Sequence, residues 1–162
     1  LLTLLAVVGC LSVGHAQIDI KLNPVFLLAE VGQFSIEYAA SEDWGLETEF
    51  MLAKDAKYVF AQGKHYLKPN KGTDGFNIGA LLGYMSIRDY VFDRNGEYGI
   101  HTQNNVGLGF FTGYKWISPK NIIFELAIGV GRAYGNDLGL FPYAKIYFGY
   151  RFKAKSKDKQ PI

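Results

Sequence analysis

The last part of the chain alternates strictly between apolar and polar positions. One row is apolar and mostly aromatic toward its end: Ala144, Ile146, Phe148, Tyr150 and Phe152. The other row sets two cations and a glycine between tyrosines: Tyr143, Lys145, Tyr147, Gly149 and Arg151. A period of two indicates a β-strand with two different faces. If the same alternation recurs around a closed sheet, the apolar row can face lipid instead of a second protein layer.

The same alternation recurs along the chain and predicts a sheet without helices. The expected strands are residues 18–23 (continuing through Pro24 towards Leu28), 33–40, 44–52, a stretch within 58–67, 75–86, 105–116, 122–134 and 140–152. Pro24 suggests a bulge in the first strand, and the facing of the fourth strand is ambiguous. The pattern predicts an all-β fold, an eight-stranded antiparallel up-and-down transmembrane β-barrel.

The connections and the tryptophans favour a membrane barrel over a soluble sandwich. If both termini lie on the periplasmic side, the short connections 41–43 and 118–120 lie there too. The longest connection, 87–104, then falls on the outer side, as is usual in outer-membrane barrels. Trp44 and Trp116 fall at periplasmic strand ends on the apolar row, where an aromatic girdle is expected.

The inward rows carry nearly balanced charge. The expected lumen charge network contains the acids Asp19, Glu37, Glu47, Glu49 and Glu125 and the bases Lys21, Lys115, Lys145 and Arg151. A narrow lumen needs such balance because unpaired buried charge is costly. An eight-stranded barrel is just wide enough to be filled by its own side chains, so no conducting pore is expected. If the first and last strands close the sheet, Asp19 and Arg151 should pair.

The two ends of the chain have a different composition from the barrel, which is expected over residues 17–152. Residues 1–16 contain no Asp, Glu, Lys or Arg and end in small residues before Gln17. They are too short to cross a bilayer as a helix and indicate a cleaved signal peptide that lacks its beginning. Cys10, the only cysteine, allows a lipid-attachment site as the alternative. Residues 153–162 are expected to form a basic periplasmic tail.

The outer connection carries the clearest candidate for a contact surface. Asn95-Gly96 is a strong hairpin signal, so the strands on either side could continue as a protruding ribbon. A plain solvated loop is the alternative. The candidate surface-contact residues are Arg88, Tyr90, Phe92, Arg94, Tyr98 and His101. Exposed strand edges and aromatic side chains favour contact with another protein or with lipopolysaccharide.

Other classes of function find little support in the residues. A net charge of +2 in 162 residues gives no argument for nucleic-acid binding. No His/Cys cluster predicts a metal site, and no cofactor is expected. A lipid A deacylase would carry His-x-Ser on a strand, whereas His65 and His101 both lack the serine, although Ser86 could approach. A soluble lipocalin-like carrier would need an apolar lumen, which the inward charges contradict.

Several short segments show a family resemblance. They are Lys21-Leu-Asn-Pro24, Phe34-Ser-Ile-Glu-Tyr38, Trp44-Gly-Leu-Glu47, Gly75-Phe-Asn-Ile-Gly79 and Gly149-Tyr-Arg-Phe152. The chain resembles small Gram-negative outer-membrane barrels of unknown function and is similar in size to OmpA- and OmpX-type barrels. The resemblance implies the barrel and residence among outer-membrane lipid and lipopolysaccharide, and it brings no catalytic residues. The leading hypothesis is a non-enzymatic barrel with a structural or surface-contact role; the alternative is a lipid-modifying outer-membrane enzyme.

Overall fold

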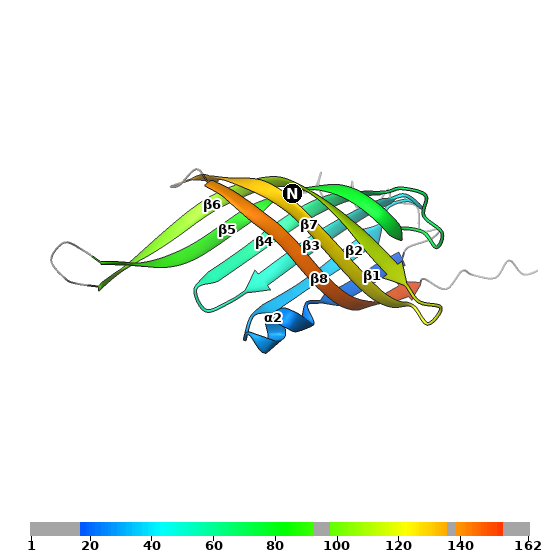
Figure 1. Cartoon of the computed structure of the whole chain (residues 1–162), viewed down its shortest axis with the longest axis horizontal. Coiled ribbons are helices and arrows are strands. Elements are labelled where there is room, and N and C mark those ends of the chain that lie inside the picture. Colours follow the sequence, from blue (N-terminus) through cyan, green and yellow to red (C-terminus); the bar gives the residue numbers. More distant parts are fainter. Residues whose placement is uncertain (1–16, 93–97, 136–138, 154–162) are drawn as a thin grey trace, which may run out of the picture.

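The computed structural model describes residues 17–92, 98–135 and 139–153 and shows a closed β-barrel (Figure 1). Each strand pairs antiparallel with its neighbour in sequence, and the first strand pairs with the last. The expected eight-stranded up-and-down fold is confirmed. The elements are β1 (Gln17–Leu22), α2 (Pro24–Leu28), β2 (Gly32–Ala39), β3 (Trp44–Leu52), β4 (Ala56–Tyr66), β5 (Gly75–Phe92), β6 (Tyr98–Ile117), β7 (Ile122–Gly135) and β8 (Gly139–Lys153).

The wall of the barrel is apolar outside and, where β1 and β8 close the sheet, polar inside. At the closure, Ile18 on β1 lies opposite Phe152 on β8 and both are exposed, while Asp19 lies opposite Arg151 and both are buried. This distribution is the reverse of that in a water-soluble carrier, so the lipocalin-like alternative does not fit. Among the described residues, no helix has the length and apolar character needed to cross a membrane.

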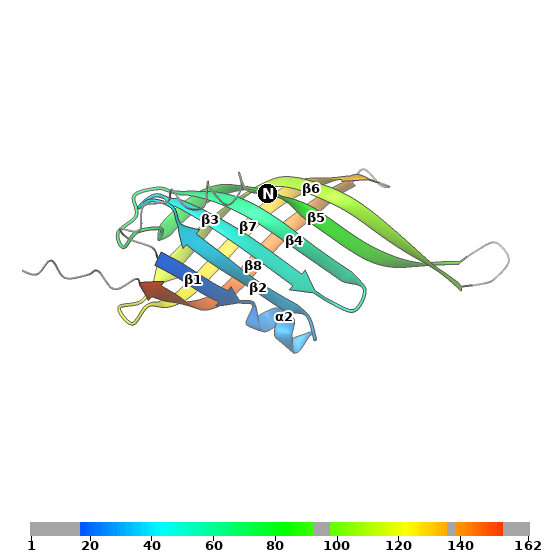
Figure 2. The ribbon, with the colours of Figure 1, turned by 180° about the vertical axis from the view of Figure 1, so that it is seen from behind.

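The strands are very unequal in length. We call the end of the barrel where Gln17 and Lys153 pair the terminal end, and the opposite end the ribbon end. β1 has only 6 residues, whereas β5 has 18 and β6 has 20. β4 pairs with β5 as far as Ile87, and β7 pairs with β6 as far as Asn105. Beyond these residues β5 and β6 pair with each other up to Phe92 and Tyr98, as a two-stranded ribbon that projects from the barrel in Figures 1 and 2.

The first connection is helical, so the expected continuation of strand one to Leu28 with a bulge at Pro24 is wrong. Asn23 is the N-cap of α2, and its Oδ1 accepts hydrogen bonds from the backbone N–H groups of Val25 at 3.1 Å and Phe26 at 3.3 Å. Pro24 occupies the first turn, where its missing N–H would have had no helical partner. Together, the cap and the proline favour a helical turn over an extended strand.

The structure settles the facing of β4. Tyr58, Phe60, Gln62, Lys64 and Tyr66 form its inward row, and their neighbours point outward. Because three of the five inward residues are aromatic, this strand does not follow the rule of apolar outside and polar inside. For this reason the facing of β4 is ambiguous in the sequence.

Candidate functional site

The lumen at the terminal end is closed by one arginine. Arg151 on β8 donates from Nε and Nη2 to the two carboxylate oxygens of Asp19, at 2.7 and 2.8 Å. It also donates to the carbonyl oxygens of Lys71 and Gly72 and to Thr73 Oγ1, at 3.0, 2.8 and 2.8 Å. These three residues belong to the connection between β4 and β5. One guanidinium therefore joins β1, β8 and this connection at the mouth of the barrel.

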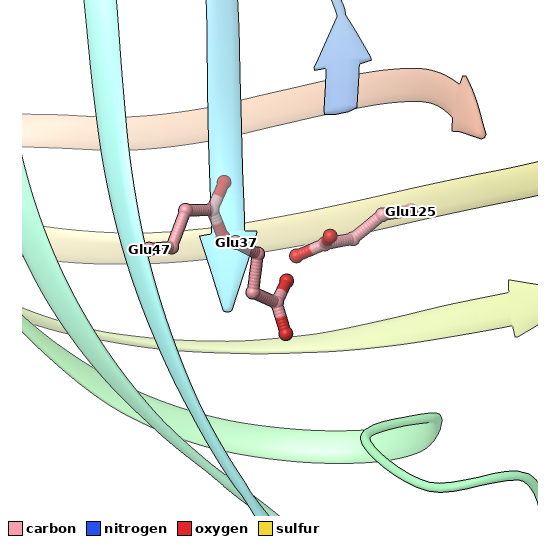
Figure 3. A group of neighbouring side chains, drawn as sticks. All are labelled: Glu37, Glu47 and Glu125. Atoms are coloured by element: carbon pink, nitrogen blue, oxygen red, sulfur yellow. The ribbon is translucent and has the colours of Figure 1, made fainter. Parts of the chain in front are cut away.

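Three buried glutamates converge further inside, and Figure 3 shows that they come from different parts of the wall. Glu37 lies on β2, Glu47 on β3 and Glu125 on β7, and each offers a carboxylate oxygen within 4.8 Å of the others. Lys21 Nζ lies 2.7 Å from Glu37, 3.1 Å from Glu47 and 2.6 Å from Glu125. Lys64 Nζ contacts the same three carboxylates, with Glu37 at 2.9 Å and Glu125 at 2.6 Å.

Two ammonium groups thus lie at the centre of a carboxylate cluster whose geometry alone would suit a metal ion. A carboxylate triad attracts any cation, and here the cations come from the chain itself. Since Lys21 and Lys64 both contact all three glutamates, these side chains act as internal cross-links between β1, β2, β3, β4 and β7. Each of the three carboxylates is paired with ammonium groups in this arrangement.

Two further lysines extend the network along the barrel. Lys115 Nζ lies 2.9 Å from Asp19 and 2.7 Å from Glu37, and so links the mouth to the glutamate cluster. Lys145 Nζ lies 3.1 Å from Glu47 and 3.2 Å from Glu125, on the ribbon side of the cluster. It also donates to Gln62 Oε1 at 3.2 Å. The ionic contacts are therefore continuous from the mouth to the middle of the lumen.

Glu49 marks the boundary of the ionic region because its hydrogen-bond donors are uncharged. It accepts from the amides of Gln33 and Gln62 at 2.8 and 2.6 Å. The hydroxyls of Tyr58 and Tyr143 also donate to it, both at 2.5 Å. Four neutral donors satisfy this carboxylate, which a buried charge requires in place of a salt bridge.

The lumen beyond Glu49 is filled by an apolar cluster. Its buried members are Phe60, Leu81, Met85, Phe111, Ala127 and Tyr143. Phe60 stacks on Phe141 with ring centroids 6.0 Å apart, and Phe111 lies 5.4 Å from Tyr143. A Cβ on Gly131 would lie inside the space taken by the Phe141 ring. Inward glycine therefore makes room for large rings in a barrel of this width.

All nine residues of the expected lumen network lie buried inside the barrel, and Asp19 pairs with Arg151. The sequence reasoning missed Lys64, because it sits on the strand whose facing was ambiguous. One signal could have found it: the expected inward rows held one acid more than bases. With Lys64 included, the inward charges on the described strands are five acids and five bases.

The candidate contact residues are spread along the ribbon. Arg88 and His101 are exposed. Tyr90, Phe92 and Tyr98 lie in its paired backbone. Arg94 and the Asn95-Gly96 turn lie outside the described residues, as do the expected signal peptide with Cys10 and residues 154–162 of the expected tail.

The structure does not bring His65 and Ser86 together. His65 lies on the outward row opposite Ile78, whereas Ser86 is buried and lies opposite Lys57. Both belong to outward rows, since Lys57 and Ile78 are exposed, but they sit at different ends of the β4–β5 pair. His65 and Ser86 are therefore not placed to act together, as a lipid A deacylase-like site would require of them.

No protein-family model matches the chain, and no curated protein sequence matches it. Among solved structures, the N-terminal β-barrel domain of Pseudomonas aeruginosa OprF is similar, with a TM-score of 0.56 at 16% sequence identity. The match covers 86% of this chain and 98% of that domain. At this identity the similarity establishes the shared barrel fold.

Proposed function

We propose that this chain is a non-enzymatic outer-membrane β-barrel that contacts another surface through its ribbon. The observation that carries the proposal is the combination of an apolar exterior with a lumen filled by its own side chains. Five acids and five bases close the terminal half, and an aromatic cluster closes the other half. A filled lumen favours a role for the outside of the molecule over transport through it.

Exterior aromatic residues support the placement in a membrane. Trp116 packs against Phe124 with ring centroids 5.4 Å apart, and Phe124 lies 4.8 Å from Phe148. These residues belong to β6, β7 and β8 and are exposed or half-exposed on the outward face near the terminal end. A belt of aromatic residues is typical of the membrane–water interface. The terminal end would then face the periplasm, and the ribbon would point outward from the cell.

The ribbon supports a contact role because its two strands lack flanking strands. Past Ile87 and Asn105, β5 and β6 pair only with each other in the described sheet. Ile100 on this segment is 67% exposed, an unusual position for a large apolar side chain in water. Exposed strand edges accept an added strand, and the mixed charged and apolar surface also suits lipopolysaccharide. The partner is therefore another protein or lipopolysaccharide.

A ribbon replacement tests this role. Residues 89–101 are replaced by Asn-Gly, because Arg88 and Thr102 lie directly opposite each other and a two-residue turn can join them. A photoreactive residue is placed at Ile100 in the full chain, or at Ile128 on the outward face as the matched control. Crosslinking is performed in outer membranes. We expect the Ile100 site to form a discrete adduct with protein or lipopolysaccharide, while Ile128 yields lipid adducts only.

The shortened chain gives the decisive comparison. An added excess of wild-type chain is expected to compete for the partner and to reduce the yield of the Ile100 adduct. An added excess of the shortened chain should not reduce it. Equal competition by both would remove the ribbon-contact idea. Heat-dependent gel migration in detergent serves as the folding control, since a folded barrel migrates as a compact, heat-sensitive form. Absence of that form in the wild type would count against the membrane barrel itself.

A further inference from the structure

Gly63 on β4 has no structural reason to be glycine. It faces outward, its backbone does not have a positive φ, and a Cβ built on it would meet nothing within 4 Å. Lumen glycines differ, since a Cβ on Gly79 or Gly83 would collide with a ring or with backbone. An absent side chain at an exposed strand position weakens the strand without improving the packing. The open space outside Gly63 is therefore a candidate binding site.

Small residues on β4 and β5 lie beside this glycine and form the floor of a groove, which Leu46, opposite Gly63 on β3, also lines. Gly63 lies opposite Ala80 on β5, and its neighbour along the strand face, Ala61, lies opposite Thr48 on β3. Bulkier side chains border the floor, including Phe50. The groove has a volume of about 740 Å³ and crosses the outside of β2 to β6. Its shape and apolar lining fit a hydrocarbon chain.

A polar pocket continues from the groove at the terminal end. Tyr38 lines both, and the second pocket has a volume of about 660 Å³. It lies between the start of β1, the β2–β3 turn and the β4–β5 connection, with Gln17, Ser41, Glu42, Asn70 and Lys71 around it. Gln17 Oε1 is buried and has no hydrogen-bond partner among the described residues. A polar ligand atom would satisfy it.

We propose that the groove and the pocket form one site for a zwitterionic phospholipid. The acyl chain lies over Gly63, and the headgroup lies in the pocket beyond Tyr38. Glu42 supplies a carboxylate for the headgroup ammonium, and Lys71, whose Nζ already donates to Ile117 O at 3.0 Å, has further donors for the phosphate. The inference rests on the proposed membrane placement, which puts this end of the barrel at the inner leaflet.

The position of the pocket at the terminal end indicates which class of lipid binds. Lipopolysaccharide would present its headgroup at the ribbon end, far from Glu42 and Lys71. Within a bilayer, one acyl chain replaces another, so specificity comes from van der Waals fit in the groove and from polar contacts at the headgroup. A preference of about fivefold over ordinary surrounding lipid is therefore the expected scale.

A photoreactive lipid tests the site in the full chain. The probe is phosphatidylethanolamine with a diazirine in its acyl chain, added to vesicles of phosphatidylethanolamine with a minor fraction of phosphatidylglycerol. We expect adducts to concentrate on β3, β4 and β5 around Gly63. Gly63→Leu, whose Cβ has open space around it, should fill part of the groove and lower this labelling about fivefold. Ala144→Leu, on the outward face of β8, adds apolar bulk elsewhere and should leave it unchanged.

Two comparisons make the result decisive. First, Glu42→Gln should reduce the preference for the phosphatidylethanolamine probe over a matched phosphatidylglycerol probe. Second, a diazirine fatty acid should label the groove of the wild-type chain more weakly than either phospholipid probe. Labelling spread evenly around the exterior, or unaffected by Gly63→Leu, would mean ordinary surrounding lipid and would overturn the site. If the fatty acid labels as strongly as the phospholipid, the pocket does not hold the headgroup. Either failure, with the heat-sensitive barrel form intact, leaves the membrane proposal standing.

Discussion

The two halves of the lumen are filled by opposite kinds of interaction. The terminal half is held by salt bridges in which each lysine meets two or three carboxylates, whereas the ribbon half is held by packed rings. Removing one member of the ionic half leaves buried charge without compensation. Removing one member of the apolar half leaves a cavity that neighbours can partly fill. The two halves should therefore respond differently to single substitutions.

The largest effect is expected for Lys64→Met. The substitution removes one of the two ammonium groups shared by Glu37, Glu47 and Glu125 and keeps the length of the side chain. It should lower the free energy of unfolding by about 3–5 kcal/mol, measured by urea titration of tryptophan fluorescence in lipid vesicles. Lys57→Met on the same strand is the matched control, because Lys57 points outward, and it should change stability by less than about 0.5 kcal/mol. Equal effects of the two would refute the ionic account.

A smaller loss is expected for Leu81→Ala in the apolar cluster. Leu81 is only 1% exposed, so truncation should cost about 3 kcal/mol through lost contacts and a residual cavity. The neighbouring outward residue gives the control: Leu82 is 55% exposed and Leu82→Ala should cost much less. The same urea titration measures both. If Leu81→Ala lowered the free energy of unfolding by less than Leu82→Ala does, the ribbon half of the lumen would be loosely filled.

The smallest effect is expected where the halves meet. Tyr143 packs in the aromatic cluster and donates to Glu49 at 2.5 Å, so Tyr143→Phe keeps the ring and removes the hydrogen bond. Glu49 retains three other donors, and the loss should be about 1–2 kcal/mol. Tyr150→Phe, an exposed tyrosine on the same strand, is the control and should be nearly neutral. A loss as large as that of Lys64→Met would mean that the halves are one cooperative network.

Some features could be read from local pattern alone and one was misread. The sequence predicted eight strands and the facing of seven of them, because a period of two assigns every second residue to one side. The helical turn α2 had a local signal as well, since Asn23 followed by Pro24 is a helix start. The run of apolar residues around this signal was interpreted as a strand instead.

The sequence by itself determined that this chain forms a barrel with an apolar exterior and with charged residues in its lumen, because alternation along each strand requires no knowledge of its neighbours. Only the tertiary structure decided which charges meet. Lys21 on β1 and Lys64 on β4 both reach Glu125 on β7, a strand far away in sequence that closure of the sheet brings around the same narrow axis. Closure also determined the facing of β4. In the sequence, the aromatic inward row of this strand resembles a lipid-facing row, and only its register with β3 and β5 places it inside the barrel.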